Sequence, residues 1–232
     1  MIDGILLIDK EEGITSYDVI RKLKKILPKG QKIGHAGTLD PFATGLLIVL
    51  LGRGTKLMEK FHQEEKVYIV TGEFGYATDT QDSTGTKISK AETSTPIPQS
   101  GIENVIENYF KGEISQLPPS YSAKKINGQK AYTLAREGKE VILEKKDINI
   151  GEFQILKYDW HLVTCHVRCS TGTYIRTLID DLGKKLNSYA IAISLRREQI
   201  GKFSVNSAVN SKDLDKVDLM ECVLNLDDIK DE

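Results

Sequence analysis

Hydrophobic and polar positions along the first quarter of the chain predict two buried strands with a helix between them. Residues 4–9 and 46–51 are short apolar runs, a pattern typical of strands that are covered on both faces. Thr15 and Asp18 have the spacing of a capping box at a helix start. The apolar positions that follow keep helical spacing up to Pro28, which ends the helix: Val19, Ile20, Leu23, Ile26 and Leu27.

In the rest of the chain, strand patterns adjoin other strands about as often as they adjoin helices. The polar stretch 76–98, rich in Thr, Ser and Asp, predicts a long loop. The predicted strands are 67–74, 141–155, 160–169 and 189–195, and the predicted helices are 56–65, 101–110, 129–136 and 174–186. This order predicts an α+β fold, in which a mixed, largely antiparallel sheet is flanked by helices.

Composition describes an ordinary globular protein. The chain has 232 residues, 40% hydrophobic and 28% charged, which is enough for one large domain or two small ones. Its longest apolar run, 46–51, is too short to span a membrane, and the N-terminus has no basic leader. Cys165 and Cys169 lie in a predicted strand, about 13 Å apart, which is too far for a disulfide. We therefore expect a reducing, cytoplasmic location and no zinc site.

Charge is distributed unevenly, although the formal net charge is only −1. Residues 212–232 hold three basic and eight acidic side chains, so the preceding 211 residues carry a net +4. Within these, residues 111–146 hold eight basic and four acidic side chains. Such a local excess is what contact with phosphates requires, although scattered, solvated lysines give the same count.

The stretch 32–56 combines glycines with candidate chemistry. His35, Thr38 and Asp40 stand between glycines, and Pro41 biases Asp40 toward an extended conformation. A flexible loop that presents a carboxylate and an imidazole beside a buried strand is a plausible active site. On composition alone, a tight turn whose Asp and Thr bond only to their own backbone is the better explanation of these residues.

Common nucleotide, calcium and hydrolase motifs do not occur. Residues 52–56 end like a phosphate-binding loop but lack its spacing, and residues 79–85 lack the closing Glu of a calcium loop. No dinucleotide-binding or serine-hydrolase motif is present. Asp79 and Asp82 could act as paired carboxylates in glycoside hydrolysis, but a polar loop offers such pairs by chance.

Four separated motifs point to one family. They are GHAGTLDP (34–41), KVYIV (66–70), CSTGTYIRTL (169–178) and SLRR (194–197). With the opening GILLIDK and the PSYSA segment, they resemble the TruB family of pseudouridine synthases over about residues 1–205. The resemblance implies the pseudouridine synthase fold and isomerisation of the uridine at position 55, in the T-loop of tRNA, after the base has flipped out of its stack.

The resemblance also implies the catalytic residues. Asp40 matches the family's nucleophile, and Arg176 matches the cation that pairs with this carboxylate. Tyr68 matches the tyrosine under the flipped uracil, which assists proton removal in some proposals. Whether the carboxylate attacks C1′ of the ribose or the uracil ring stays open.

Further residues match positions that bind the substrate. Tyr174 and Leu195 correspond to residues that close around the flipped nucleotide, and His35 to a histidine that fills the space it leaves. Lys56 and Asp82 match polar positions near the site.

Residues 118–141 correspond to a thumb-like insertion that closes over RNA. In this segment Lys124 and Lys125 would contact phosphates. We expect a catalytic domain over residues 1–211 and an acidic tail over 212–232, with no full C-terminal PUA module.

The implied reaction changes no oxidation state, so we expect no cofactor and no metal. The expected partner is the T-arm and elbow of tRNA, with no membrane and no obligatory protein partner, and the expected state is a monomer. Two other functions remain as alternatives. One is a guide-RNA-dependent pseudouridine synthase, and the other is a non-catalytic RNA chaperone that refolds the tRNA elbow. The intact Asp40, Tyr68 and Arg176 argue against a purely binding role.

Overall fold

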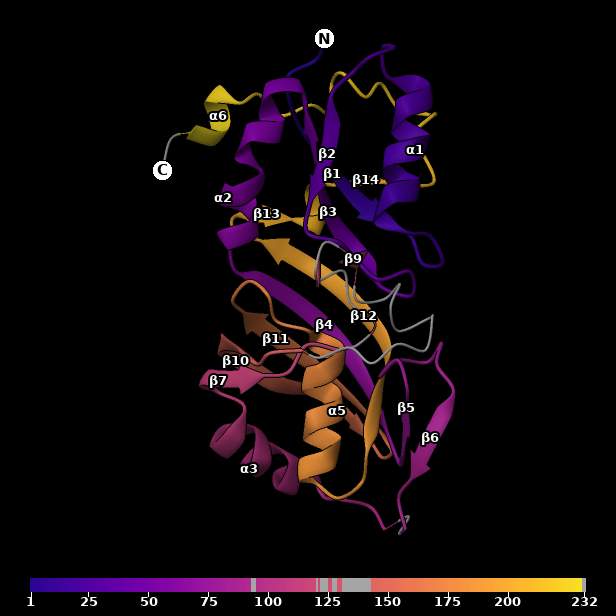
Figure 1. Ribbon diagram of the computed structural model, residues 1–232, viewed down its shortest axis with the longest axis vertical. Helices are drawn as coiled ribbons and strands as arrows, with labels where there is room; N and C mark the ends of the chain where they lie inside the picture. The colour runs from indigo at the N-terminus through magenta and orange to yellow at the C-terminus, as the bar shows by residue number, and fades with distance from the viewer. Residues whose placement is uncertain (93–94, 120, 122–124, 127–128, 131–142, 231–232) are drawn as a thin grey trace. The chain divides into compact units, whose positions relative to one another are not determined.

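The computed structural model describes residues 1–92, 95–119, 121, 125–126, 129–130 and 143–230 (Figure 1). The chain forms two compact units. Unit 1 comprises Met1–Tyr68 and Leu195–Glu232, and unit 2 comprises Ile69–Ser194. The division falls inside two long strands, β4 (Lys66–Phe74) and β12 (Ala190–Ile200), so each of these strands contributes residues to both units.

Strand β3 (Thr44–Leu51) is the centre of the unit 1 sheet. It pairs antiparallel with β1 (Gly4–Lys10) along one edge. Along its other edge it pairs antiparallel with β2 (Ile33–Ala36) and, at its start, parallel with β12. Two short strands extend this sheet, β14 (Val209–Asn210) beside β1 and β13 (Phe203–Ser204) beside β12. The two predicted buried strands, 4–9 and 46–51, are thereby confirmed.

The apolar run in β3 is continuous because both faces of the strand are covered. Leu47 and Val49 pack in the same cluster as the buried side of helix α1 (Ser16–Ile26). Ile48 and Leu50 pack with Phe61 of helix α2 (Met58–Gln63) in a second cluster. Since successive strand residues point to opposite faces, both sets must be apolar. The predicted capping box at Thr15 is present, and the helix predicted over 56–65 is divided between the 3₁₀ helix η1 (Gly52–Leu57) and α2.

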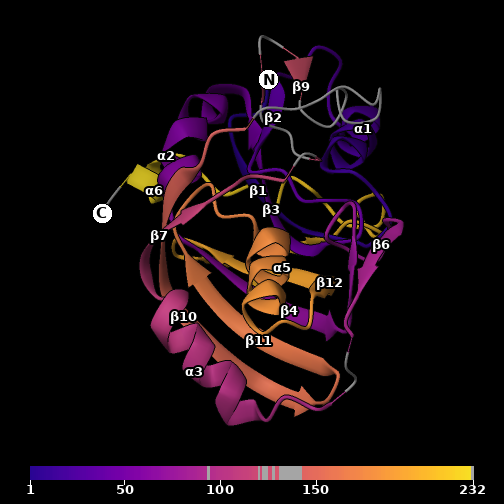
Figure 2. The ribbon, with the colours of Figure 1, turned by 60° about the horizontal axis from the view of Figure 1, so that its bottom comes forward.

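Unit 2 contains a sheet with helices on one face. Its order is β12, β4, β11 (Leu162–Cys169), β10 (Lys146–Asp159) and β7 (Gly112–Gln116). Helices α3 (Gln99–Tyr109) and α5 (Ile175–Lys185) lie side by side on this sheet (Figure 2). The predicted α+β fold with a mixed, largely antiparallel sheet is confirmed.

Two local predictions were wrong. The stretch 76–98 contains two paired strands, β5 (Tyr76–Thr78) and β6 (Lys87–Lys90), because its Thr and Ser residues hide the alternation of a half-exposed hairpin. The helix predicted from residue 129 is strand at its start, where β9 (Gln129–Lys130) pairs with β8 (Lys125–Ile126) across an Asn-Gly turn signal. Its remainder, 131–136, lies outside the described residues. Nearer the C-terminus, residues 214–222 form mostly turns, and the short helix α6 (Asp227–Lys230) follows.

No helix among the described residues is long and apolar enough to cross a membrane.

Candidate active site

Asp40 lies in the loop of residues 37–43, called here the Asp40 loop, which joins β2 to β3 in unit 1. The N–H of Gly13 donates to the carbonyl of Pro41 at 2.8 Å, and the N–H of Ala43 donates to the carbonyl of Asp40 at 3.1 Å. Gly37 opens the loop with φ of +84°, a conformation that favours glycine. The side chain of Asp40 is half-buried. The backbone around the candidate nucleophile is therefore fixed by contacts on both sides.

Ser16, the first residue of α1, holds the residue that precedes Asp40. Its hydroxyl accepts a hydrogen bond from the N–H of Leu39 at 2.9 Å and donates to the carbonyl of Leu39 at 3.2 Å. Ser16 is 1% exposed, so water cannot replace these bonds without opening the structure. One buried hydroxyl thus anchors the loop to the start of the helix.

Lys10, the last residue of β1, is a buried cation beneath the Asp40 loop. Its Nζ donates to the carbonyls of Glu11 and Ile14 at 2.8 Å and of Pro41 at 3.3 Å. Burial lowers the pKa of the ammonium from 10.5 to about 8, and the charge of Asp40 is the largest effect in the opposite direction. Lys10 and Asp40 therefore sense each other electrostatically within unit 1.

Arg197, in the unit 1 part of β12, ties the first residue of the Asp40 loop to strand β3. Its Nε donates to the carbonyl of Leu46 at 2.7 Å, and its Nη2 donates to the carbonyl of Gly37 at 2.9 Å. A Cβ added to Gly45 would lie 2.3 Å from the carbonyl oxygen of Arg197, closer than real Cβ contacts. The glycine therefore lets β3 and β12 approach at the point where the loop ends.

The other predicted unit 1 residues occupy different environments. Tyr68 and Leu195 are nearly buried, at 9% and 7% exposure, and they are the unit 1 residues of β4 and β12 that adjoin the division in each strand. His35 is half-buried on β2, whereas Lys56 is exposed on η1. Lys66, the lysine of the K-x-Y motif, donates to the carbonyls of Phe61, His62 and Glu64. It caps the C-terminus of α2, where a cation is favourable.

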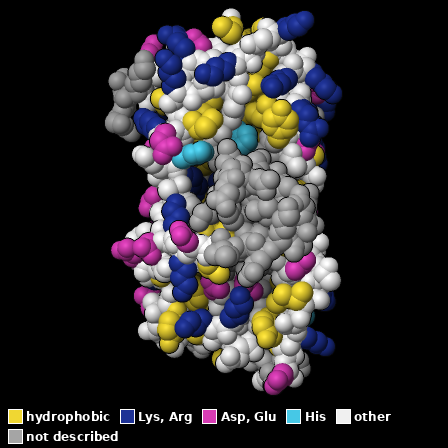
Figure 3. Space-filling view, viewed as in Figure 1, with side chains coloured by type: hydrophobic (Ala, Val, Ile, Leu, Met, Phe, Trp, Pro, Cys, Tyr) yellow, Lys and Arg dark blue, Asp and Glu magenta, His cyan; other side chains and the backbone are white. Residues whose placement is uncertain are grey.

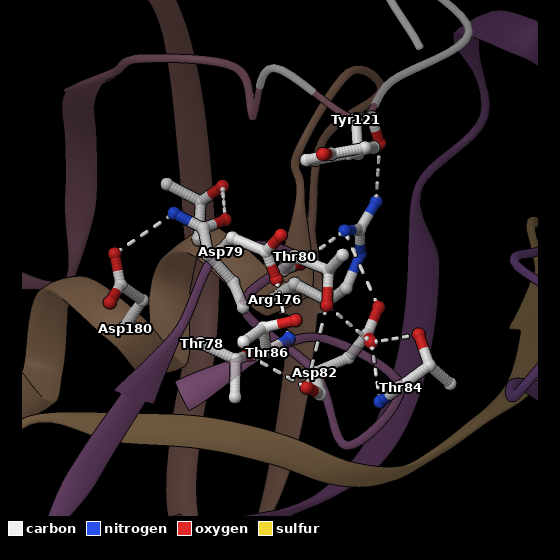
Figure 4. Close-up of polar contacts among 11 residues, drawn as sticks. Thr78, Asp79, Thr80, Asp82, Thr84, Thr86, Tyr121, Arg176 and Asp180 are labelled. Carbon is white, nitrogen blue, oxygen red and sulfur yellow. Dashed lines mark hydrogen bonds and ion pairs between the residues drawn. The ribbon is translucent and has the colours of Figure 1, made fainter. Parts of the chain in front are cut away.

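Arg176 lies in unit 2, in the first turn of α5, and it is only 4% exposed. Its Nη1 donates to the carbonyl of Thr80 at 2.5 Å, and its Nη2 donates to the carbonyl of Tyr121 at 2.8 Å. The carboxylate of Asp82 is 3.5 Å from Nη1 (Figure 4). Arg176 is therefore not an ordinary surface arginine. Its acidic partner, Asp82, lies in the same unit.

Asp82 is itself buried, at 4% exposure, in the connection between β5 and β6. Its Oδ1 accepts hydrogen bonds from the hydroxyls of Thr80 and Thr84, at 2.7 and 2.6 Å, and from the N–H of Thr84 at 2.9 Å (Figure 4). A buried carboxylate needs such donors to remain charged. The structure thus brings Asp82 and Arg176 together, two residues that the sequence predicted separately.

Tyr174 immediately precedes α5 as its N-cap residue. The side-chain amide of Gln116 pairs with its backbone: Nε2 donates to the carbonyl of Tyr174 at 3.0 Å, and the N–H of Tyr174 donates to Oε1 at 2.8 Å. Gln116 is 2% exposed at the end of β7. The helix start that carries Arg176 is therefore fixed to the sheet.

Comparison with known proteins identifies the family. The model of the TruB family pseudouridylate synthases (N terminal domain) matches residues 24–175. A relative from Endomicrobium trichonymphae, named tRNA pseudouridine synthase B, is 46% identical over 217 residues, which are 94% of this chain and 93% of the relative. This chain belongs to the TruB family.

Other TruB-family comparisons agree. A tRNA pseudouridine synthase B from Fusobacterium nucleatum subsp. nucleatum is 45% identical over 204 residues, covering 88% of this chain and 70% of the relative. Among solved structures, a Cbf5-Nop10-Gar1 complex contains a chain with 28% identity and a TM-score of 0.69 over 91% of this chain. This chain spans about half the length of that chain, 53%.

Sequence reasoning missed several buried residues that hold the predicted site residues within each unit. Lys10 and Arg197 each come just after an apolar strand pattern, where a charged residue is not unusual. Ser16 and Gln116 look like ordinary polar residues in the sequence. The available signal was the family motif itself, since GILLIDK ends in Lys10 and SLRR ends in Arg197. Burial depends on the tertiary fold, which no local pattern contains.

Lys124 lies outside the described residues, and of Lys125 only the backbone, in β8, is described. Their contacts with phosphates stay a prediction. Among the residues that the structure describes, no group of three or more His, Cys, Asp or Glu could hold a metal ion.

Proposed function

We propose that this TruB-family protein converts uridine 55 in the T-loop of tRNA to pseudouridine, with Asp40 as the nucleophile. The observation that carries the proposal is the 46% identity, over nearly the full length of both chains, to a relative named tRNA pseudouridine synthase B. Support comes from the Asp40 loop, whose backbone is anchored by three buried side chains: Lys10, Ser16 and Arg197.

The proposed reaction is an isomerisation in which no atom is gained or lost. The bond between ribose C1′ and uracil N1 breaks, the base turns, and C1′ bonds to C5. The proton leaves C5, and N1 gains a proton from solvent. A carboxylate can form a covalent intermediate that holds the sugar or the base during this turn. Asp40 is half-buried on a fixed backbone, which suits a group that must meet a substrate atom in a defined direction.

Other residues have proposed roles in addition to that of Asp40. The nearly buried ring of Tyr68 would support the extruded uracil, since flipped bases are commonly held on aromatic faces. Tyr174 and Leu195 would close around the nucleotide, and His35 would fill the space that it leaves. Arg176 would supply positive charge for the reaction, and its guanidinium is already buried away from water.

Binding of the RNA backbone has support in unit 1. Lys and Arg side chains gather on the face of unit 1 around α1 (Figure 3). On this helix Arg21 and Lys24 both lie near the exposed ring of Tyr17, at 5.6 and 6.0 Å from its centre. Cations beside an exposed aromatic ring are a favourable combination for nucleic acid. We therefore expect tRNA affinity to fall as salt rises.

The test uses tRNA transcripts that carry tritium at C5 of uridine. Wild-type protein should release tritium from a transcript with a uridine at position 55 and should release none when that position is cytidine. Asp40→Asn should bind the same tRNA with unchanged affinity and lose at least about 10⁴-fold in rate, the usual scale for loss of a nucleophile.

The results separate the alternatives. If the wild-type protein releases no tritium, the proposed enzymatic function is wrong. If Asp40→Asn turns over at the normal rate, Asp40 is not the nucleophile. An Asp40→Asn variant that still accelerates refolding of the tRNA elbow would show a second, chaperone activity. A requirement for an added guide RNA would favour the guide-dependent synthases. The identity of 46% to a relative named tRNA pseudouridine synthase B, against 28% to the chain in the Cbf5-Nop10-Gar1 complex, favours the tRNA enzyme.

A further inference from the structure

Gln81 has a backbone conformation that is uncommon for its residue type. Its φ is +62°, in the left-handed region, and it lies between Thr80 and Asp82 in the connection from β5 to β6. A side chain in this region costs free energy relative to glycine. Such a conformation persists only where the surroundings impose it, so the contacts of Gln81 indicate what holds it there.

Two residues of α5 bind the side-chain amide of Gln81. The hydroxyl of Thr177 donates to Oε1 at 2.8 Å, and Nε2 donates to Oδ2 of Asp180 at 2.9 Å. Thr177 and Asp180 are each 3% exposed. Lys184 also donates to Oδ2 of Asp180, at 2.6 Å, which balances the buried carboxylate.

The chemistry of the contact fits an amide. Thr177 supplies a donor, and a carboxylate oxygen of Asp180 supplies an acceptor. Glutamine presents one acceptor and one donor on a planar group, so it satisfies both partners at once. A glutamate here would place a second carboxylate against Asp180.

The backbone of the same segment is fixed by β12. The carbonyl of Gln81 accepts from the N–H of Ala192 at 3.1 Å, and the N–H of Ser83 donates to the carbonyl of Ala192 at 3.3 Å. Gln81 is therefore held by the sheet through its backbone and by α5 through its side chain. Its two neighbours, Thr80 and Asp82, are the residues that contact the guanidinium of Arg176.

We propose that Gln81 is a positioning residue for the Asp82–Arg176 pair, acting through Thr177 and Asp180. The amide of Gln81 holds the connection between β5 and β6 against α5, the helix that carries Arg176. It thereby fixes where the carbonyl of Thr80 and the carboxylate of Asp82 meet the guanidinium. This inference rests on the proposed function, in which Arg176 takes part in pseudouridine formation.

The test compares Gln81→Gly with wild-type protein on the tritiated tRNA. Glycine relieves the positive φ and removes the amide, so the folded state should be retained while Arg176 loses its fixed partners. We expect the single-turnover rate constant to fall about tenfold, with the tRNA dissociation constant changed less than about twofold, because the loss concerns orientation rather than binding. Thermal unfolding of the same samples checks the fold.

A matched pair at Thr177 tests the hydrogen bond itself. Thr177→Val removes the hydroxyl at nearly constant shape, whereas Thr177→Ser keeps it. Thr177→Val should slow single turnover by more than about twofold, but no more than Gln81→Gly, and Thr177→Ser should remain within about twofold of wild type. The double variant Gln81→Gly/Thr177→Val should be no slower than Gln81→Gly alone, since both substitutions remove the hydrogen bond between Thr177 and Gln81.

Three results would overturn the positioning role: rates within twofold of wild type for Gln81→Gly and Thr177→Val, equal losses in Thr177→Ser and Thr177→Val, or additive losses in the double variant. Each requires an active wild-type protein. Inactive wild-type protein would instead overturn the proposed function.

Discussion

The Asp40 loop of unit 1 and the Asp82–Arg176 pair of unit 2 are both built from buried polar groups, but different atoms are held. In the Asp40 loop, the buried side chains of Lys10, Ser16 and Arg197 bind backbone carbonyls and N–H groups. In unit 2, the charged ends of Asp82 and Arg176 are themselves bound and almost fully buried. In unit 1 the backbone of the loop is fixed and Asp40 stays half-buried. In unit 2 the charged groups of Asp82 and Arg176 are themselves fixed.

This difference matches the two proposed roles. A nucleophile must reach a substrate atom, so its backbone can be rigid while its side chain keeps access. A cation that acts through its field is most effective when its direction is set in advance and water is excluded. Substitutions in unit 2 should lower stability more, because removing Asp82 or Arg176 leaves the other charge buried without its partner.

The largest effect on stability is expected for Arg176→Met. It leaves Asp82 buried without its cation, so the free energy of unfolding should fall by about 3 kcal/mol, the lower part of the range for a broken buried pair, since the Thr80 and Thr84 donors remain. Urea unfolding measures this loss. The double variant Arg176→Met/Asp82→Asn should recover part of it.

The control is Arg196→Met in unit 1. Arg196 donates two hydrogen bonds to the carboxylate of Asp9, at 2.9 and 2.8 Å, but its side chain is 38% exposed. Its loss should cost no more than about 1 kcal/mol, as for other exposed ion pairs. Equal losses at the two arginines would contradict the distinction between them.

The sequence alone contained most of the local structure of unit 1. The capping box at Thr15 and the apolar run of β3 are short-range patterns, and both predictions were confirmed. The stretch 76–98 was predicted wrongly because β-propensity depends on cross-strand partners, which the local sequence does not name.

The residues of the candidate site were also predictable from the sequence only in part. The family motifs named Asp40, Tyr68 and Arg176, and the structure adds how their surroundings are held. That Arg176 pairs with Asp82 could not be inferred, because the two residues lie in distant segments joined only by the fold. Lys10 was missed because a lysine at the end of a strand ordinarily reaches solvent, and only the tertiary structure shows that it is buried.

The second prediction concerns the buried cation of unit 1. Lys10→Met removes the donor of three carbonyls, those of Glu11, Ile14 and Pro41, and should lower the free energy of unfolding by about 2 kcal/mol near neutral pH. Because one of these carbonyls belongs to the Asp40 loop, the single-turnover rate should fall as well. Normal turnover would show that the loop does not depend on Lys10.

The pH dependence of the same variant gives a sharper test. The pKa of Lys10 is about 8 in the folded protein and 10.5 as the reference for the unfolded chain, so the unfolded chain binds more protons between these values. Wild-type stability, relative to Lys10→Met, should therefore rise with pH in this window, by at most about 1.4 kcal/mol per pH unit. Parallel stability curves for the two proteins from pH 7.5 to 9.5 would mean that Lys10 is not desolvated.

The smallest effects are expected from two neighbouring hydroxyls at the start of α1. Thr15→Ala removes the helix cap, and Ser16→Ala removes the contacts with Leu39; each should cost about 1 kcal/mol of stability. Only Ser16 touches the Asp40 loop, so only Ser16→Ala should slow single turnover, by about fivefold if about 1 kcal/mol of orientation is lost in the transition state. Equal rates in the two variants would show that the loop keeps its position without this anchor, and that the unit 1 site depends on Lys10 and Arg197 instead.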